Sequence, residues 1–135
     1  MRLFADANVL LAAVLGGRAK LVFGHPQLEE VLTTAYTFAE VEEYVEVLAR
    51  KKRLPADLLL LTLAAIPVTI VDQSRYSSSL TRARKLIGRR DPDDVEILAL
   101  ALQLRLPLWS NDKDFEGTGI QLLTTEGLLR QLGMI

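Results

Sequence analysis

The sequence predicts an α/β fold, a three-layer α/β/α sandwich around a mostly parallel five-stranded sheet. Short apolar runs rich in Val, Ile and Leu alternate along the chain with stretches of helical periodicity, as they do in parallel βα units. The chain has 135 residues, which is the usual size of one domain, so we expect a single domain over residues 1–135. Half of the residues are hydrophobic, which is enough to build a core, and helices must cover both faces of such a sheet.

The expected strands are short apolar runs bounded by polar or turn residues, at residues 2–5, 31–34, 68–71, 107–110 and 120–123. The expected helices lie between and after them, at residues 9–15, 18–23, 38–52, 56–65, 79–87, 92–104 and 125–132. Polar residues typical of helix starts are Thr37 with Glu40 three residues later, Asp91 before Pro92, and Thr125. Glycines typical of helix ends are Gly24, Gly88 and Gly133. Residues 72–79, which are rich in serine, predict a loop.

The longest uncharged apolar run covers residues 58–71 and is shorter than the ~20 residues that a membrane-spanning helix needs. A buried helix followed by a strand is the better interpretation of this run. Arg2 and Asp6 interrupt the first residues, so no apolar signal segment is expected there. These observations predict a cytoplasmic protein with no membrane association.

The composition excludes several classes of site. The chain has no cysteine and one histidine, which excludes thiolate zinc sites, cysteine nucleophiles and most histidine-based metal sites and triads. Any chemistry must therefore come from carboxylates and hydroxyls.

Two acidic residues stand close to apolar residues in the first half of the chain. Asp6 directly follows the first expected strand, and it is either a helix cap or, if Asn8 caps the helix instead, a free functional carboxylate. Glu40 lies at the edge of the apolar stripe of its helix, whereas the other acids of that helix lie on the far side, with Arg50. A capping box with Thr37 is the structural alternative for Glu40.

Two further acids come from the second half. Asp94 opens a helix that is apolar nearly all round, and it shares a face with Ile97 and Leu98, whereas Asp93 aligns with Glu96 and is expected to face water. Asp112 follows the fourth expected strand, as Asp6 follows the first. Helix-start and turn chemistry explain each of these acids singly.

Together, the four acids Asp6, Glu40, Asp94 and Asp112 are expected to converge at the carboxyl edge of the sheet, where ligands of parallel sheets bind. Clustered carboxylates cannot all be ionised unless a positive charge holds them. A site with only oxygen ligands favours Mg²⁺ or Mn²⁺. Such a site is typical of phosphodiester hydrolysis.

The residues that carry this pattern resemble the PIN domain ribonucleases, and among them small prokaryotic proteins like the VapC toxins. The matching segments are residues 4–10, 37–40, 91–98 and 109–115, in that order. Two departures are Ala7, where relatives often carry Ser or Thr, and Trp109-Ser110, where an aliphatic residue and Thr are common. Neither departure removes a carboxylate.

The resemblance implies a function and roles for named residues. Asp6, Glu40, Asp94 and Asp112 would be catalytic and would ligate Mg²⁺ or Mn²⁺, with Asp114 as an extra acidic ligand. Asn8 and Ser110 would be polar neighbours of the site. The implied reaction is cleavage of single-stranded or loop RNA that leaves a 5′-phosphate. The resemblance also implies an antitoxin partner and a homodimer.

The net charge of −1 lacks the basic footprint of a strong nucleic-acid binder. A local basic segment nevertheless leads into the acids, with Arg75, Arg82, Arg84, Lys85, Arg89 and Arg90. Arg89 and Arg90 are the candidate contacts for substrate phosphate because they lie closest in sequence to Asp94.

Two other classes of protein compete with a nuclease. Phosphotransfer enzymes and receiver modules also place acids after the first strand, but Asn8 stands where the former need a second aspartate, and Asp6 lacks the acidic neighbour that the latter need. A module that binds metal and RNA with little or no turnover is the stronger alternative, because the same acids serve both.

Overall fold

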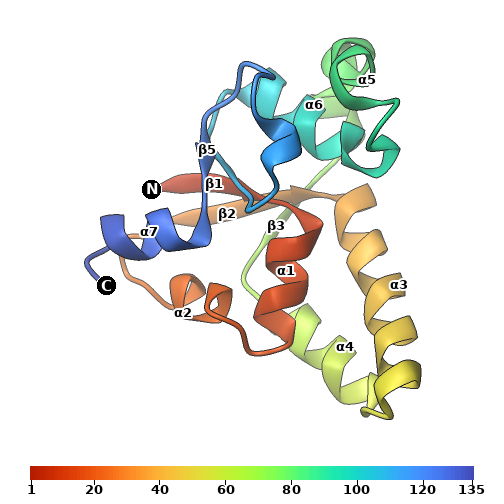
Figure 1. Cartoon of the computed structure of the whole chain (residues 1–135), viewed down its shortest axis with the longest axis vertical. Helices are drawn as coiled ribbons and strands as arrows, with labels where there is room; N and C mark the ends of the chain where they lie inside the picture. Colours follow the sequence, from red (N-terminus) through yellow and green to blue (C-terminus); the bar gives the residue numbers. More distant parts are fainter.

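The computed structural model describes residues 1–135 and confirms the predicted fold class. All five strands are parallel and lie in the order β3-β2-β1-β4-β5, with helices on both faces of the sheet. In Figure 1, β1 and β2 cross the middle of the molecule, with α1, α2, α4 and α7 on one side and α5 and α6 on the other.

The strands are β1 (Arg2–Ala5), β2 (Glu30–Thr34), β3 (Thr69–Val71), β4 (Leu108–Trp109) and β5 (Leu122–Leu123). The α-helices are α1 (Ala7–Val14), α2 (Ala19–Phe23), α3 (Ala35–Lys52), α4 (Ala56–Ala65), α5 (Leu80–Ile87), α6 (Val95–Leu104) and α7 (Thr125–Gln131). Four short 3-10 turns are η1 (Gln73–Arg75), η2 (Ser77–Ser79), η3 (Pro92–Asp94) and η4 (Lys113–Phe115). All predicted strands and helices therefore exist. The last two strands are shorter than predicted, and the expected loop 72–79 contains η1 and η2.

The alternation of side chains along the central strands separates two hydrophobic cores. In β1, Leu3 and Ala5 enter the core that α1, α2, α4 and α7 cover, while Phe4 enters the core beneath α5 and α6. In β4, Trp109 joins the first core and Leu108 the second. Because β1 and β4 are buried on both faces, their positions relative to each other are closely determined.

The start of α3 differs from the prediction. The helix begins at Ala35, and the buried side chain of Thr34 caps it by accepting a hydrogen bond from the backbone N–H of Thr37 at 2.9 Å. The Oγ1 atoms of Thr34 and Thr37 also share a hydrogen bond of 2.7 Å. The expected capping box of Thr37 with Glu40 is therefore wrong, which leaves Glu40 free of a capping role.

Other helix starts also differ by one or a few residues. Asp91 makes no capping hydrogen bond, because η3 precedes α6 and moves the start of the α-helix to Val95. The cap of α7 is Thr124, whose side chain accepts from the N–H of Gly127, rather than Thr125. The interpretation of residues 58–71 as a buried helix followed by a strand is wrong in part, since only Leu63 of α4 is fully buried.

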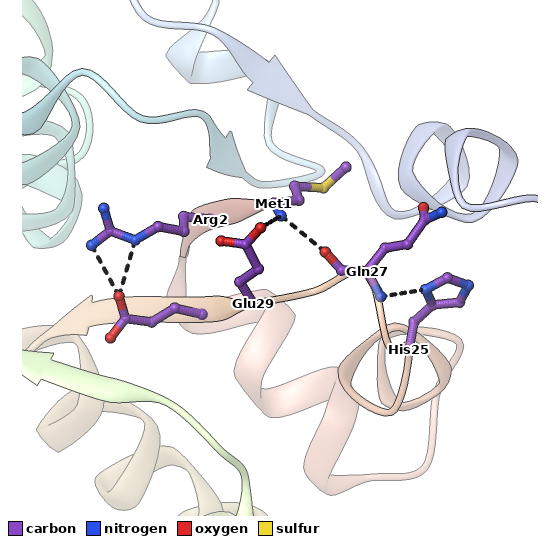
Figure 2. A network of polar contacts seen from close by, with 6 residues as sticks. Met1, Arg2, His25, Gln27 and Glu29 are labelled. Carbon is purple, nitrogen blue, oxygen red and sulfur yellow. Dashed lines mark hydrogen bonds and ion pairs between the residues drawn. The ribbon is translucent and has the colours of Figure 1, made fainter.

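A polar network ties β1 to the segment that leads into β2 (Figure 2). The amino group of Met1 donates to the carbonyl of Gln27 at 2.9 Å and forms an ion pair with Glu29 at 3.1 Å. His25 accepts a hydrogen bond from the N–H of Gln27 at its Nδ1 atom, at 3.1 Å. The chain's one histidine therefore has a structural role at the edge of the sheet that lies away from the predicted acidic site.

No helix of the chain combines the length and the apolar character that are needed to cross a bilayer.

The Thr34 cap gives a test of this fold. We expect Thr34→Ala to lower the free energy of unfolding by about 1 kcal/mol, because it removes the acceptor of a helix N-terminal N–H group. The measurement is urea unfolding followed by circular dichroism. Thr62→Ala is the control, because Thr62 is a threonine in α4 whose hydroxyl bonds only to Leu58 of its own helix, and we expect it to change stability by less than about 0.5 kcal/mol. Equal losses in both variants would contradict the capping role of Thr34.

Candidate active site

The candidate site lies where the order of the strands reverses. In the sheet, β2 and β3 lie on one side of β1, and β4 and β5, which come later in the chain, lie on its other side. β1 and β4 are therefore neighbours although about a hundred residues separate them in sequence, with Ala5 opposite Trp109. Open parallel sheets bind their ligands beyond the carboxyl ends of the strands at such a switch point.

Asp6 leaves β1 at this point, and its side chain is almost fully buried, with 3% of its surface exposed. Its Oδ1 accepts a hydrogen bond from the N–H of Val9 at 2.9 Å, and its Oδ2 accepts one from the hydroxyl of Ser110. Asp6 itself therefore caps α1, and the alternative in which Asn8 takes over the cap is wrong. Asn8 is exposed and lines a cleft together with Glu40.

Burial dominates the electrostatics of Asp6. Desolvation raises the pKa of Asp6 to about 6, although the hydrogen bonds from Ser110 and Val9 lower it, and the charge of Asp112 raises it further. A carboxyl group in this state exchanges its proton near neutral pH. The cap on α1 and the candidate carboxylate of the site are thus the same group.

The segment after β4 presents two more predicted residues. The buried hydroxyl of Ser110 donates to Asp6 and accepts from the N–H of Asp112 at 3.0 Å, so it joins the two strand ends. Asp112 in turn accepts from the N–H of Asp114 at 2.9 Å, which opens η4. Asp112 is half-buried and Asp114 is exposed.

Asp94 comes to the same place from the start of α6. Its carboxyl is half-buried and makes no capping hydrogen bond. Desolvation raises the pKa of Asp94 to about 7, and the charges of Asp6, Asp91, Asp112 and Glu40 raise it further, in that order. The charges of all the other predicted acids except Asp114 therefore act on the pKa of Asp94.

Glu40 reaches the cluster from α3. Its side chain is half-buried, whereas Glu42, Glu43 and Glu46 are exposed, as the helical pattern predicted. Desolvation, followed by the charges of Asp93 and Asp6, raises the pKa of Glu40. Glu40 and Asn8 line a cleft of about 200 Å³ between α1 and α3.

Asp91 also belongs to this cluster, which its sequence did not predict because its place before Pro92 is typical of a helix cap. Its Oδ2 is buried and accepts no hydrogen bond. The neighbouring carboxyl of Asp114, and then burial, raises the pKa of Asp91. Arg90 lies close by, with Nε 4.0 Å from Oδ2 of Asp91, and donates from Nη2 to the carbonyl of Asp114 at 2.8 Å.

A second missed feature is a hydrogen bond between α3 and η3. The hydroxyl of Tyr36 donates to Oδ1 of Asp93 at 2.8 Å. Asp93 is exposed, as expected, but its carboxylate is also bound by the hydroxyl of Tyr36. This hydrogen bond is the largest of the causes that raise the pKa of Tyr36 to about 12. A tyrosine four residues before Glu40 was the signal for this contact, because residues spaced by four share a helix face.

Arg89 is exposed and makes no ion pair.

The acids interact through their charges, but no three of them form a closed set of metal ligands. Both oxygens of Asp6 already accept hydrogen bonds, and Oδ1 of Asp112 accepts one as well. The donor set of the cluster is all-oxygen and anionic, which fits a hard divalent cation in kind.

The model of the PIN domain family matches residues 4–133. No curated protein matches the chain. Two similar solved structures are VapBC2 from Rickettsia felis bound to a DNA fragment from its promoter, and VapBC-1 from nontypeable Haemophilus influenzae. The first is 14% identical over 92% of this chain and 98% of the matched chain, with a TM-score of 0.65. The second is 14% identical over 93% and 99%, with a TM-score of 0.67. At this identity the likeness concerns the fold.

The raised pKa values predict how stability depends on pH. The pKa of Asp94 is about 7 in the folded chain against an ordinary 3.8, and that of Asp6 is about 6. Between about pH 4 and 7 these two groups therefore bind more protons in the folded chain than in the unfolded chain, so we expect them to lower the free energy of unfolding as the pH rises. We expect Asp94→Asn to make the dependence of the free energy of unfolding on pH shallower, by an amount that corresponds to at most about one bound proton.

The measurement is urea unfolding in EDTA at several pH values. Asp57→Asn is the matched control, because Asp57 is exposed on α4, and it should leave the slope unchanged. A wild-type protein that gains stability from pH 4 to 7 would contradict the raised pKa values of these acids.

Proposed function

The chain belongs to the PIN domain family, and from this membership we propose that it is a divalent-metal-dependent ribonuclease that hydrolyses phosphodiester bonds of single-stranded or loop RNA. The observation that supports the proposal most directly is the state of Asp94. Its carboxyl is half-buried and uncapped, and desolvation, followed by the charges of Asp6, Asp91, Asp112 and Glu40, raises its pKa to about 7. Helix-start chemistry alone gives no reason for this convergence.

The proposed metal residues are Asp6, Glu40, Asp94 and Asp112, with Asp114 as an additional acid. When bound, Mg²⁺ or Mn²⁺ supplies an activated water and neutralises charge on the phosphoryl oxygens. Asp94 and Glu40 are the free carboxylates of the set, while Asp6 is oriented by the hydroxyl of Ser110 and the N–H of Val9. Asp6 thus provides a fixed reference position for the site, and the other acids adjust around it.

The two arginines before η3 are the candidate contacts for substrate phosphates. Arg90 is already held beside Asp91 and Asp114, so its remaining N–H groups are positioned at the edge of the cluster. Arg89 is exposed and makes no ion pair, which leaves its guanidinium available. We propose that both arginines contact phosphates next to the bond that is cleaved.

A protein partner is the second part of the proposal. The similar solved structures are VapBC proteins, so we propose that the chain acts as the toxin of a toxin-antitoxin pair and binds a small antitoxin. We also propose a homodimer. Leu58 and Leu61 of α4 expose 59% and 67% of their surfaces, and exposed apolar residues on one short helix favour a protein interface.

The carboxylates give a direct test of the enzyme. We expect Asp94→Asn to weaken binding of Mn²⁺ and to reduce cleavage of a labelled single-stranded RNA by roughly two orders of magnitude or more. Calorimetry measures the metal and a gel assay measures the cleavage. Glu42→Gln is the control for general loss of acidic charge, since Glu42 is exposed on the outer face of α3.

The same assay separates the alternative function. A wild-type protein that binds Mn²⁺ and RNA but never cleaves would be a binding module, and the enzyme proposal would fail. Metal binding that is unchanged in Asp94→Asn would restrict Asp94 to a structural role at the start of α6.

The interface gives a separate test. We expect the chain to have the mass of a dimer in light scattering at micromolar concentration, and Leu61→Asp to give a monomer, because a charge in an apolar interface opposes association. Asp57→Asn on the same helix is the control and should leave the mass unchanged. A monomeric wild-type protein would contradict the homodimer.

A further inference from the structure

A second concave site lies at the opposite end of α6 from the acids. It has a volume of about 350 Å³, and α5, the end of α6 and the segment before β5 form its walls. Its lining residues are Arg82, Ala101, Leu102, Arg105, Leu106, Gly119, Ile120 and Gln121. This volume lies within the range of pockets that hold small ligands.

The charged residues that line this pocket are all positive. Arg82 and Arg105 both line it, and no acidic residue does. Neither arginine makes an ion pair. The guanidinium of Arg82 lies over Gly119, with Nη2 3.8 Å from the position that a Cβ atom would take there. Two exposed arginines therefore line one hollow of a chain whose net charge is −1, and no acidic residue lines it with them.

Helix electrostatics account for one of these arginines but not for the other. Arg105 caps the C-terminus of α6, where a cation is favourable. Arg82, in contrast, lies in the first turn of α5, where a cation is unfavourable, and this turn has no acidic residue and no side-chain cap. A bound anion beside Arg82 would offset the unfavourable helix dipole, and it would lie in the pocket that Arg105 also lines.

The other walls of the pocket indicate the kind of anion. Leu102, Leu106 and Ile120 form an apolar side, and the amide of Gln121 offers both a donor and an acceptor. Arginine is the side chain that best matches phosphate, because its planar group donates two parallel hydrogen bonds. A phosphate with an attached base and ribose satisfies both the cationic and the apolar walls.

We propose that Arg82 and Arg105 form a binding site for the phosphate of a nucleotide, either free or within a single-stranded nucleic acid. The site is separate from the acidic cluster, because α6 lies between Asp94 at its start and Arg105 at its end, and ten helical residues span about 15 Å. The proposal does not depend on nuclease activity. It stands if the acids prove to be structural.

The test is calorimetric titration of the full chain in EDTA, so that no cleavage occurs, with three probes: inorganic phosphate, 5′-AMP and a short single-stranded oligoadenylate. We expect Arg82→Gln and Arg105→Gln each to weaken binding of a phosphate-bearing probe by tenfold or more. Adenosine without phosphate should not bind. Binding of 5′-AMP identifies a site for free nucleotide, and binding of the oligonucleotide alone identifies a site for backbone phosphate.

Two matched variants control for surface charge. Arg84→Gln alters the same helix α5 but a residue that lines another cleft, beside Gly88 and Pro92. Arg53→Gln alters an arginine that caps α3 in the same left-handed conformation as Arg105. Both controls should bind as the wild type does. Equal weakening in all four variants, or no binding of any phosphate probe to the wild type, would overturn the proposal.

Discussion

The parallel pairing of β1 with β4 is the constraint on which the rest of the molecule depends. Two short strands from the two ends of the chain meet, with Phe4 opposite Leu108 and Ala5 opposite Trp109. Their side chains alternate between two cores, so a shift by one residue would turn apolar side chains to the wrong face. This register places Asp6 and Ser110, each one residue beyond its strand, close enough to share a hydrogen bond. The site is thus a direct consequence of the sheet topology.

The site carries an electrostatic cost that the cores offset. Burial and mutual repulsion raise the pKa values of Asp6, Glu40, Asp91 and Asp94, so each of these groups opposes the ionised folded state. The opposing contributions are few and local: the hydroxyl of Ser110, the N–H of Val9 and the guanidinium of Arg90. A fold selected for stability alone would replace such carboxylates with neutral groups, because an unpaired buried charge is destabilising. Their presence at one edge is the observation on which the proposed metal-binding role of these acids rests.

The sequence was sufficient to predict the fold class and an acidic cluster beyond the strand ends, because both follow from the alternation of strands and helices along the chain. Asp6 and Asp112 follow expected strands, and helical periodicity separated Glu40 from Glu42 and Asp94 from Asp93. The exact helix starts were not predictable in the same way. Thr34 and Thr37 are both good caps, and the choice between them depends on the backbone dihedrals at the end of β2, which local sequence does not specify. The pairs Tyr36–Asp93 and Asp91–Asp114 were missed because each joins segments whose distance only the tertiary structure determines.

Helix α6 explains why one small chain can present sites of opposite charge. Its side chains from Ile97 to Ala101 are buried, so it is fixed along its length between the sheet and α5. Its N-terminus, which prefers anions, carries Asp94, and its C-terminus, which prefers cations, carries Arg105. The dipole of the helix therefore favours the sign of charge that the sequence places at each end. The same dipole opposes the binding of a ligand at each end. A cation bound by Asp94 would lie beside the positive end of the helix, and an anion bound by Arg105 would lie beside the negative end. Binding at either end must therefore come from converging side chains of other segments, which are Asp6, Glu40 and Asp112 at one end and Arg82 at the other.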